Sequence, residues 1–463
     1  MRCKDRVYSN IAPNFLFLWQ NLLNMQRKIY HIITIHIRIL LLISLSTQIM
    51  AQDTVTVMQY NLLEYGNYNS GFAECYETNN NTQRKDECIR TLMDFVKPDI
   101  LTVCEFGATQ TLLDGFLRHN LNVNGATYWK SDNIINYAGS NIINHIFYDS
   151  RKMVLKKHVA LRTSPRDTDI YELYLKTKAL AAGDTIKLVC IVAHPKAGQG
   201  YEASRRALMQ IAMDYVNQHY ANDNVLIMGD FNMYGASESG YRLLTQTYSN
   251  PHACFIDPLF SVNGVGEWNN NSQYAPFHTQ STRSYSDECF SPGGLDDRFD
   301  FILMADEIAF SYKHLRYVAN SYRAVGNDGR HFNQSVDQGY NAAVPAEVAE
   351  ALFDASDHLP VTMKIAVDTH LGVSETEQPR MQASIAPNPV TNIATVYFNN
   401  PKEGKVRFEI HSLQGQVVMS TMDYFSEGER QHKLNLDNLD KGFYLLRIEN
   451  EVGGFETLKL IKQ

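Results

Sequence analysis

Cysteine is scarce in this sequence, and none of the seven cysteines forms a CxxC pair. Thiolate zinc sites need closely spaced cysteines, and no histidine-rich stretch offers a substitute, so a zinc cage is excluded. Cys104 and Cys190 lie in the apolar runs "LTVCE" and "LVCIVAH". We expect both of them to be small core residues on strands.

The remaining cysteines raise the question of disulfides. An even number, six, is left once Cys3 is removed with the N-terminal leader described below, and an exported protein permits disulfide bonds. We predict Cys75–Cys88 and Cys254–Cys289, because each pair flanks a loop-rich stretch. Sequence alone does not give connectivity, so other pairings stay open.

The hydrophobic run near the N-terminus is short. Arg27, Lys28 and Arg38 precede the apolar run Ile39 to Leu45, and a small residue, Ala51, offers a cleavage point. Residues 1–51 are therefore predicted to be an N-terminal extension and secretory signal peptide, with an uncleaved anchor as the alternative. The run is too short to cross a bilayer, so no stable membrane span is expected.

Basic residues are fewer than acidic ones. The whole chain has a formal net charge of −8, and without residues 1–51 it keeps 36 basic and 49 acidic residues, a net charge of −13. Tight, salt-sensitive binding of nucleic acid depends on Lys and Arg, so such binding is excluded as the main role. An enzyme that meets phosphates through a bound cation is not excluded.

The pattern of hydrophobic residues divides the chain into parts. Over residues 52–367, short apolar strands alternate with helical stretches such as 82–97 and 202–220, which predicts an α/β domain. Periodicity is lost over 368–382, which indicates a linker. Evenly spaced alternating strands with Gly and Asn turns over 383–463 predict a small all-β sandwich.

Polar side chains interrupt several of the apolar strands near their ends. In "VLIMGDFNMYG", Asp230 and Asn232 share a face with Leu226 and Met228, because side chains alternate along a strand. One such residue is more often a turn former, and a lone histidine is more often structural. Their recurrence favours a common site, made of Asn61, Glu105, His194, Asp230, Asn232, Asp300, Asp357 and His358.

These residue types suit metal-assisted phosphoester hydrolysis. Asn61, Glu105 and Asp357 offer the oxygen ligands that Mg²⁺ prefers; Mn²⁺ could replace it, and Ca²⁺ could serve as a structural ion. His358, oriented by Asp300, could take a proton from attacking water. Asp297 competes with Asp300 for that orienting role.

Two further residues of the set are suited to binding the substrate phosphate rather than the metal. His194 and Asn232 could donate hydrogen bonds to the charged phosphorus centre, where negative charge accumulates on the non-bridging oxygens.

The ordered motifs "QYNLL", "VCEFG", "AHPKAG", "MGDFNMYG", "DDRFDFIL" and "ASDHLPV" resemble those of the endonuclease/exonuclease/phosphatase superfamily, which includes deoxyribonuclease I-like nucleases. The resemblance covers residues 55–367. It implies a four-layered sandwich of two packed β-sheets flanked by helices, with the site at one sheet edge. It also implies Asp230 near the nucleophile and an Asp300–His358 dyad, since "RFDFIL" fits the family's Arg-x-Asp-aromatic pattern.

The C-terminal part carries a second resemblance. The segments "IAPNPVTNIATVYF", "SLQGQVV" and "LDKGFYLLRIENEVGGFETLKLIKQ" resemble a type IX secretion sorting domain. This implies contact with a secretion machinery and export across an outer membrane, to a secreted or cell-surface location. An adhesive or carbohydrate-binding sandwich is the alternative, because the fold alone does not assign function.

The substrate is predicted from the loops. In the insert 263–296, Trp268 could stack on a base, and Arg283 or His278 could meet a phosphate; a loop packed on itself is the alternative. Amide-rich rather than Lys-rich loops favour a monomeric extracellular nuclease acting on DNA or RNA. A sphingomyelinase-like or small-molecule phosphoesterase is the alternative, and retention of the reacting groups disfavours a catalytically dead binding module.

Overall fold

The computed structural model describes residues 54–68, 75–176, 185–245, 255–261, 266–309, 311, 313–367, 381–412, 416–451 and 455–463. The predicted signal peptide lies outside these residues, as does nearly all of the predicted linker. Among the described residues, no helix has the length and apolar character needed to cross a membrane.

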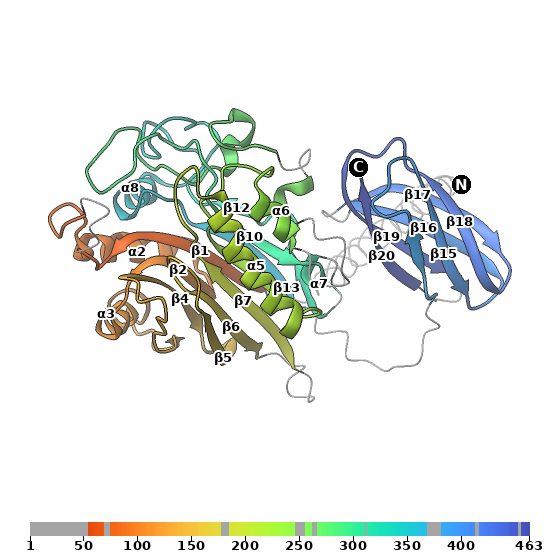
Figure 1. Cartoon of the computed structure of the whole chain (residues 1–463), viewed down its shortest axis with the longest axis horizontal. Coiled ribbons are helices and arrows are strands. Elements are labelled where there is room, and N and C mark those ends of the chain that lie inside the picture. The colour runs from red at the N-terminus through yellow and green to blue at the C-terminus, as the bar shows by residue number, and fades with distance from the viewer. Residues whose placement is uncertain are drawn as a thin grey trace, which may run out of the picture. The chain divides into compact units, whose positions relative to one another are not determined.

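The first sheet of the larger domain has seven strands (Figure 1). Parallel pairing of β1 with β2 lies at its centre, and antiparallel pairing with β13 and β4 extends it on both sides. In spatial order the strands are β11 (Leu315–Tyr317), β13 (Val361–Val367), β1 (Thr54–Tyr65), β2 (Ile100–Gly107), β4 (Ile142–Asp149) and β3 (Trp129–Lys130), with β12 (Arg323–Ala324) also paired to β13.

The second sheet has six strands, and its parallel pair is β7 with β8. Strands β8 and β10 pair antiparallel. This pairing matters most for the site, because it brings chain segments that are distant in sequence into register. In spatial order the strands are β5 (Met153–Leu161), β6 (Thr168–Leu175), β7 (Ile186–Ala193), β8 (Val225–Asp230), β10 (Asp300–Ala305) and β9 (Phe255–Ile256).

The helices cover the outer faces of the two sheets. On the first sheet lie α2 (Thr82–Val96) and α8 (Ala346–Ala355), and α5 (Glu202–His219) lies on the second, followed by α6 (Ser239–Thr245) (Figure 1). The shorter helical segments are α3 (Gln110–Phe116), η1 (Leu117–Leu121), η2 (Pro258–Ser261), η3 (Ser272–Phe277) and α7 (Asp306–Ala309). The predicted helices over 82–97 and 202–220 are confirmed.

Alternation along β1 shows how the layers are held together. Val55 and Val57 pack with strands of the second sheet, whereas Met58 and Tyr60 pack in a separate core with α2 and α8. Both faces of the strand are therefore buried, and each belongs to a different layer contact. The predicted four-layered sandwich is confirmed.

The C-terminal part forms two antiparallel sheets around one core. Residues such as Val396, Phe408 and Leu446 fill that core and alternate with exposed or half-buried neighbours. The strands are β14 (Ser384–Ala386), β15 (Ile393–Asn400) and β18 (Gly428–Asn435) in one sheet, with β17 (Val417–Phe425), β16 (Gly404–Ser412), β19 (Gly442–Asn450) and β20 (Phe455–Lys462) in the other. The predicted small all-β sandwich is confirmed.

The disulfide pairing differs from the prediction. Cys75 bonds to Cys289, so neither Cys75–Cys88 nor Cys254–Cys289 is formed. Cys88 lies on the buried face of α2, where it packs in the core beneath the helix and does not reach the loop. Cys254 lies outside the described residues. Cys104 and Cys190 are free and buried, as predicted.

A buried ion pair fixes the start of β10. The Arg298 guanidinium donates to both carboxylate oxygens of Asp257, at 2.8 and 3.0 Å, and both side chains are almost fully buried. Tyr322 accepts a further hydrogen bond from Arg298 at 3.3 Å. Burial removes water from both charges, so each charge depends on the other for stabilisation. Removal of either partner would leave a buried charge without compensation.

Replacing Arg298 with Met should lower the free energy of unfolding by about 3–5 kcal/mol, because Asp257 would be left as an uncompensated buried charge. The double variant Arg298→Met with Asp257→Leu should recover most of that loss. Urea denaturation of the three proteins measures both effects. A single variant as stable as the wild type would contradict the prediction.

Candidate active site

The strand ends of the two sheets bring the predicted residues together. Asp300, at the start of β10, is the register partner of Asp230, at the end of β8. His194 follows β7, which runs parallel to β8. At Gly229 the two strands approach so closely that an added Cβ would lie 1.8 Å from the Ala193 carbonyl oxygen, so this position requires glycine.

Backbone irregularities aim several of these side chains. The β1–β2 and β2–β4 ladders both shift register around Glu105, and Glu105 itself has φ 56°. Asn232 has φ 52°. Non-glycine residues rarely adopt this left-handed region and do so at a cost of order 1–3 kcal/mol, which concentrates at functional sites. The surrounding fold therefore holds both residues in conformations that they would not adopt alone.

Asp230 lies at the centre of a hydrogen-bond network. Its Oδ2 accepts from Asn61 Nδ2 at 2.9 Å and lies 3.3 Å from His194 Nε2, while its Oδ1 accepts from the Asn232 backbone N–H at 3.1 Å. Asn61 Nδ2 also donates to Glu105 Oε1 at 3.0 Å. Five of the predicted residues are thus connected through a carboxylate that is 1% exposed.

His358 is oriented by Asp300. Its Nδ1 lies 2.6 Å from Asp300 Oδ2, which also accepts from Thr279 Oγ1 at 2.7 Å. The competing candidate, Asp297, instead pairs through its side chain with Asn269. Because Asp300 accepts the Nδ1 proton, the other ring nitrogen of His358, Nε2, faces the site, and it carries a free lone pair whenever the ring is neutral.

Charges around His358 change its acidity. Burial lowers the pKa of its imidazole, but Asp300, Asp230 and Asp357 outweigh burial and hold that pKa well above its ordinary value. Burial acts to raise the pKa of Asp230, but His358 and His194 hold it well below its usual range. Opposite charges therefore stabilise one another in this buried site.

The donor set fits a hard cation. Among the described residues, Glu105, His194 and Asp230 bring potential ligand atoms within 4.8 Å of one another, and so do Asp230, Asp300 and His358. Asp357 lies outside both compact groups, but its Oδ1 is buried without a hydrogen-bond partner.

An unpaired buried carboxylate oxygen is costly unless a cation or donor meets it. Burial raises the pKa of Asp357, and repulsion from Glu105 adds to that rise. Asn61 Oδ1 accepts from the Leu63 backbone N–H at 2.9 Å, so as a ligand it would share that oxygen. The predicted set of Glu105, Asn61 and Asp357 remains compatible with Mg²⁺.

The predicted substrate-binding residues are not at this centre. Trp268 is fully buried and its indole donates to the Met233 carbonyl oxygen at 2.8 Å, so neither ring face is free for a base. His278 is also fully buried and lies within 3.1 Å of two backbone carbonyl oxygens. Arg283 pairs with Asp287 and stacks on Phe290. These expectations are corrected: the three side chains are buried, and Trp268 packs in the main core of the domain against Tyr241 and Phe301.

The structure adds three residues that the sequence analysis did not identify. Gln280 Nε2 lies 2.7 Å from His358 Nε2, and the Arg166 guanidinium donates to the carbonyl oxygens of His194 and Pro195 at 3.0 and 3.2 Å. Lys85 donates to the Leu62 carbonyl oxygen at 2.7 Å. Burial lowers the pKa of Lys85 to about 7, although nearby carboxylates oppose this shift.

Of these, only Lys85 left a signal in the sequence. It shares the apolar face of α2 with Ile89 and Leu92, so its position in the helical repeat predicts burial of a charged residue.

Comparison with known families identifies the C-terminal part. Residues 384–463 match the family model described as "Secretion system C-terminal sorting domain". The match begins one residue after the predicted start at 383 and confirms the predicted resemblance. The protein is therefore exported, to a secreted or cell-surface location.

Solved structures give a weaker likeness for the larger domain. The D. rerio protein TDP2 in complex with single-stranded DNA product aligns with a TM-score of 0.43 and 10% identity, over 68% of this chain and 100% of that one. An endonuclease/exonuclease/phosphatase family protein from Bacteroides thetaiotaomicron aligns with a TM-score of 0.41 and 14% identity, over 68% and 96%. The human Nocturnin catalytic domain with bound sulfate gives 0.39 and 14%, over 69% and 97%.

These identities and scores are too low to assign an activity to this chain. No curated protein sequence matches it.

In the metal-free protein, the imidazole of His358 should titrate above the ordinary value of 6.5, and Asp300→Asn should lower the midpoint. Imidazole ¹H–¹⁵N NMR over a pH series measures both midpoints. The imidazolium stabilises the fold below pH 6.5, and this contribution is lost as the pH rises through the raised pKa. A His358 midpoint below 6.5 would contradict the electrostatics described above.

Proposed function

We propose that the protein is an exported, divalent-metal-dependent phosphodiesterase, with extracellular DNA or RNA as its substrate. One observation carries this proposal: an Asp300–His358 dyad faces the Asp230 carboxylate at the edge where both sheets end. A histidine with one nitrogen held by a carboxylate and the other directed into a site suits a general base. The predicted roles of the site residues remain proposals.

The dyad would activate water. Because Asp300 holds the Nδ1 proton, the neutral form of His358 would take a proton at Nε2 from a water that attacks in line with the ester bond that breaks. The products are a phosphate monoester and an alcohol. Gln280 Nε2 lies 2.7 Å from the same nitrogen, so water would replace this contact at the moment of attack.

The remaining residues would bind the phosphate and the cation. His194 and Asn232 would donate to phosphate oxygens, and Asp230 would orient the nucleophile. Glu105, Asn61 and Asp357 would hold Mg²⁺ or Mn²⁺. Such a cation, when bound, lowers the pKa of water and stabilises charge on the phosphoryl oxygens.

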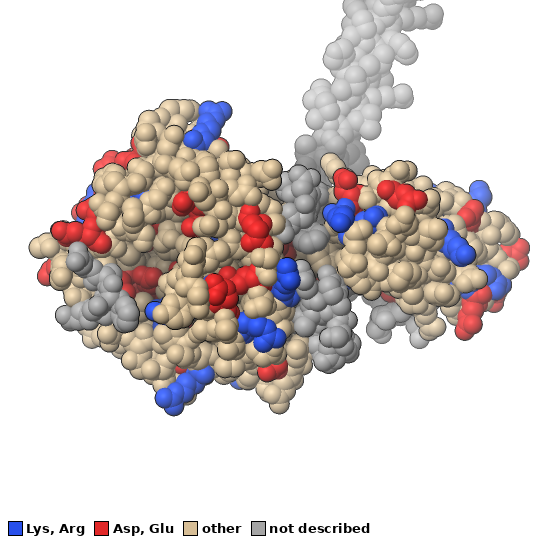
Figure 2. Space-filling model, turned by 45° about the horizontal axis from the view of Figure 1, so that its top comes forward, with Lys and Arg blue, Asp and Glu red and all other residues tan. Residues whose placement is uncertain are grey.

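The distribution of charged side chains on the surface favours binding of phosphate through a cation rather than through Lys and Arg. On the face drawn in Figure 2, Lys and Arg side chains occur singly or in small groups, with no continuous basic area among the described residues. Nucleic acid would then be bound weakly between turnovers, since affinity from phosphate neutralisation is small. Weak retention suits an enzyme that acts on many extracellular ester bonds in turn.

One observation favours the alternative, a small or lipid phosphoester. A cavity of about 420 Å³ is lined by Glu202, Glu238 and Glu267 together with Tyr234. Tyr234 packs edge-on against Phe299, the residue before Asp300. Glu238 is paired with Arg205, but Glu202 and Glu267 would repel the phosphates of a polynucleotide and would accept a cationic headgroup. We expect a monomer in either case.

Chelation should abolish hydrolysis, and added Mg²⁺ or Mn²⁺ should restore it, because the carboxylate cluster cannot by itself stabilise a phosphoryl transition state. Glu105→Gln keeps the shape of the side chain but removes its charge, and should raise the Mn²⁺ concentration needed for half-maximal activity by about tenfold or more. Exposed Glu87→Gln is the matched control. Turnover that persists in excess EDTA would contradict the metal role.

Replacing His358 with Ala should lower kcat by about a hundred- to ten-thousand-fold in the protein that remains folded, as loss of a general base does. The exposed His119→Ala is the control. Plasmid DNA, RNA, sphingomyelin and bis-p-nitrophenyl phosphate, offered side by side, identify the substrate. Preference for sphingomyelin would replace the nuclease assignment with the alternative. Binding without turnover of any substrate would indicate a dead binding module.

A further inference from the structure

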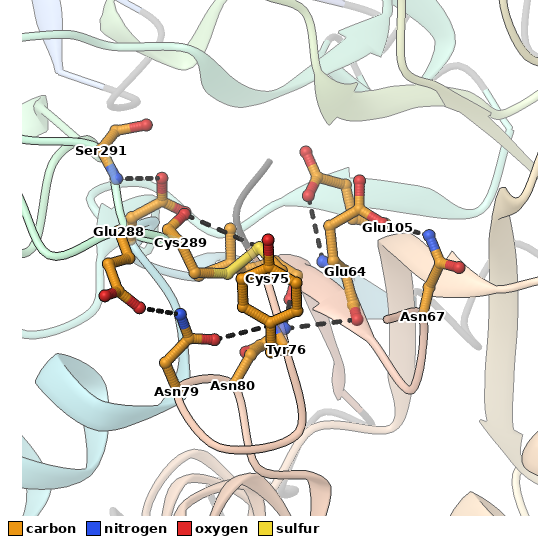
Figure 3. The surroundings of a disulfide bond; sticks show 12 residues. Glu64, Asn67, Cys75, Tyr76, Asn79, Asn80, Glu105, Glu288, Cys289 and Ser291 are labelled. Carbon is orange, nitrogen blue, oxygen red and sulfur yellow. Dashed lines mark hydrogen bonds between the residues drawn. A yellow bond between two sulfur atoms is a disulfide. The ribbon is translucent and has the colours of Figure 1, made fainter. Parts of the chain in front are cut away.

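The Cys75–Cys289 disulfide lies beside the proposed cation site (Figure 3). Cys75 and Cys289 are buried together with Leu63 and Phe290 in a small apolar cluster of their own, which we call the disulfide cluster. It is separate from the larger cores of the domain. Residues on both sides of this cluster contact the residues proposed to hold the metal.

One side of the disulfide cluster holds Asp357. Shortly after Cys289, the backbone N–H of Ser291 donates to Asp357 Oδ2 at 3.1 Å. The carbonyl oxygen of Ser291 accepts from the Ser281 hydroxyl, so the peptide groups on both sides of this residue are held. With Oδ2 occupied by this donor, the unpartnered Oδ1 of Asp357 is the oxygen available to a cation.

The other side holds Asn61 and Glu105. The backbone N–H of Leu63 donates to Asn61 Oδ1 at 2.9 Å, and that of Glu64 donates to Glu105 Oε2 at 3.1 Å (Figure 3 shows the second contact). Leu63 and Glu64 have φ 45° and 52°, a conformation that non-glycine residues keep only when their surroundings impose it.

Contacts from the Cys75 side hold that strained turn. Asn80, a few residues after Cys75, donates to the Leu63 carbonyl oxygen at 2.9 Å, and Lys85 donates to the same oxygen at 2.6 Å. The Leu63 side chain packs in the disulfide cluster. The two loops joined by the disulfide also meet through an exposed hydrogen bond from Asn79 to Glu288 at 2.6 Å, which in water contributes little.

We propose that the Cys75–Cys289 disulfide positions Asn61, Glu105 and Asp357, so that the cation site is complete only in the oxidised protein. This inference rests on the proposed function. In the oxidation, the two thiols release two electrons and two protons as their sulfurs join, and an external small-molecule disulfide is reduced to two thiols.

The sorting domain implies that the disulfide forms after export. Cytoplasmic thiols stay reduced, whereas disulfides form outside that compartment. The exported chain therefore acquires its cation site after it has left the cytoplasm, and the reduced chain does not hydrolyse phosphodiesters inside the cell that makes it.

Titration with Mn²⁺, followed by electron paramagnetic resonance, tests the proposal on the oxidised protein, on the protein reduced with dithiothreitol, and on the double variant Cys75→Ala with Cys289→Ala. The reduced protein and the double variant should bind Mn²⁺ about tenfold or more weakly, as expected when groups that orient metal ligands are lost. Cys88→Ala, a buried thiol outside the disulfide, should keep the wild-type affinity and its sensitivity to dithiothreitol. Equal affinities in all samples would overturn the proposal.

Hydrogen exchange on the oxidised and reduced proteins separates positioning from general stability. Reduction should speed exchange in segments 61–64 and 289–291 and leave β7 and β8 protected. Loss of protection throughout the core would mean that the disulfide only holds the fold, and would overturn the positioning role. Failure of the oxidised protein to bind Mn²⁺ or to hydrolyse any ester would refute the proposed function itself, a result distinct from equal behaviour of the oxidised and reduced forms.

Discussion

The register of β10 against β8 is the constraint on which the site depends. It places Asp300 opposite Asp230, and each carboxylate then faces one side of His358. A shift of one residue would turn Asp300 to the other face of the sheet and separate it from the histidine. The buried Arg298–Asp257 pair, two residues before Asp300, helps to fix this register by anchoring the start of β10.

Around this register the protein buries charges that would be unstable alone. Asp230 is stabilised by Asn61 and two histidines, and Asp300 by Thr279 and His358. Burial raises the pKa of Asp357, and it raises the pKa of Glu64, whose backbone N–H contacts Glu105, to about 7. The excess of negative charge is concentrated where a divalent cation would be bound, which is the arrangement that a hard cation requires.

Strained backbone also occurs at the site. The turn at Leu63 and Glu64 lies where β1 and β2 shift register, and the disulfide cluster packs against it. A strand that continued regularly would send alternate side chains to opposite faces and could not bring Asn61, Glu105 and the Leu63 amide to one point. The disulfide joins segments 214 residues apart, so the site combines local irregularity with a long-range covalent link.

The two packed sheets were expected from the resemblance of the motifs to a known superfamily. The sequence by itself determined an α/β domain, the helices over 82–97 and 202–220, the C-terminal sandwich and the set of polar residues at strand ends. These features depend on periodicity and on side-chain alternation, which act over a few residues. It did not determine the disulfide, because Cys75 and Cys289 become neighbours only when the two loops fold against the same edge. Nor did it show that Trp268, His278 and Arg283 are buried, since an aromatic, polar loop has the same composition whether it covers a core or lines a cleft. Tertiary packing likewise placed Gln280, Arg166 and Lys85 around the site. Each of them forms a hydrogen bond to a residue that is distant in the sequence.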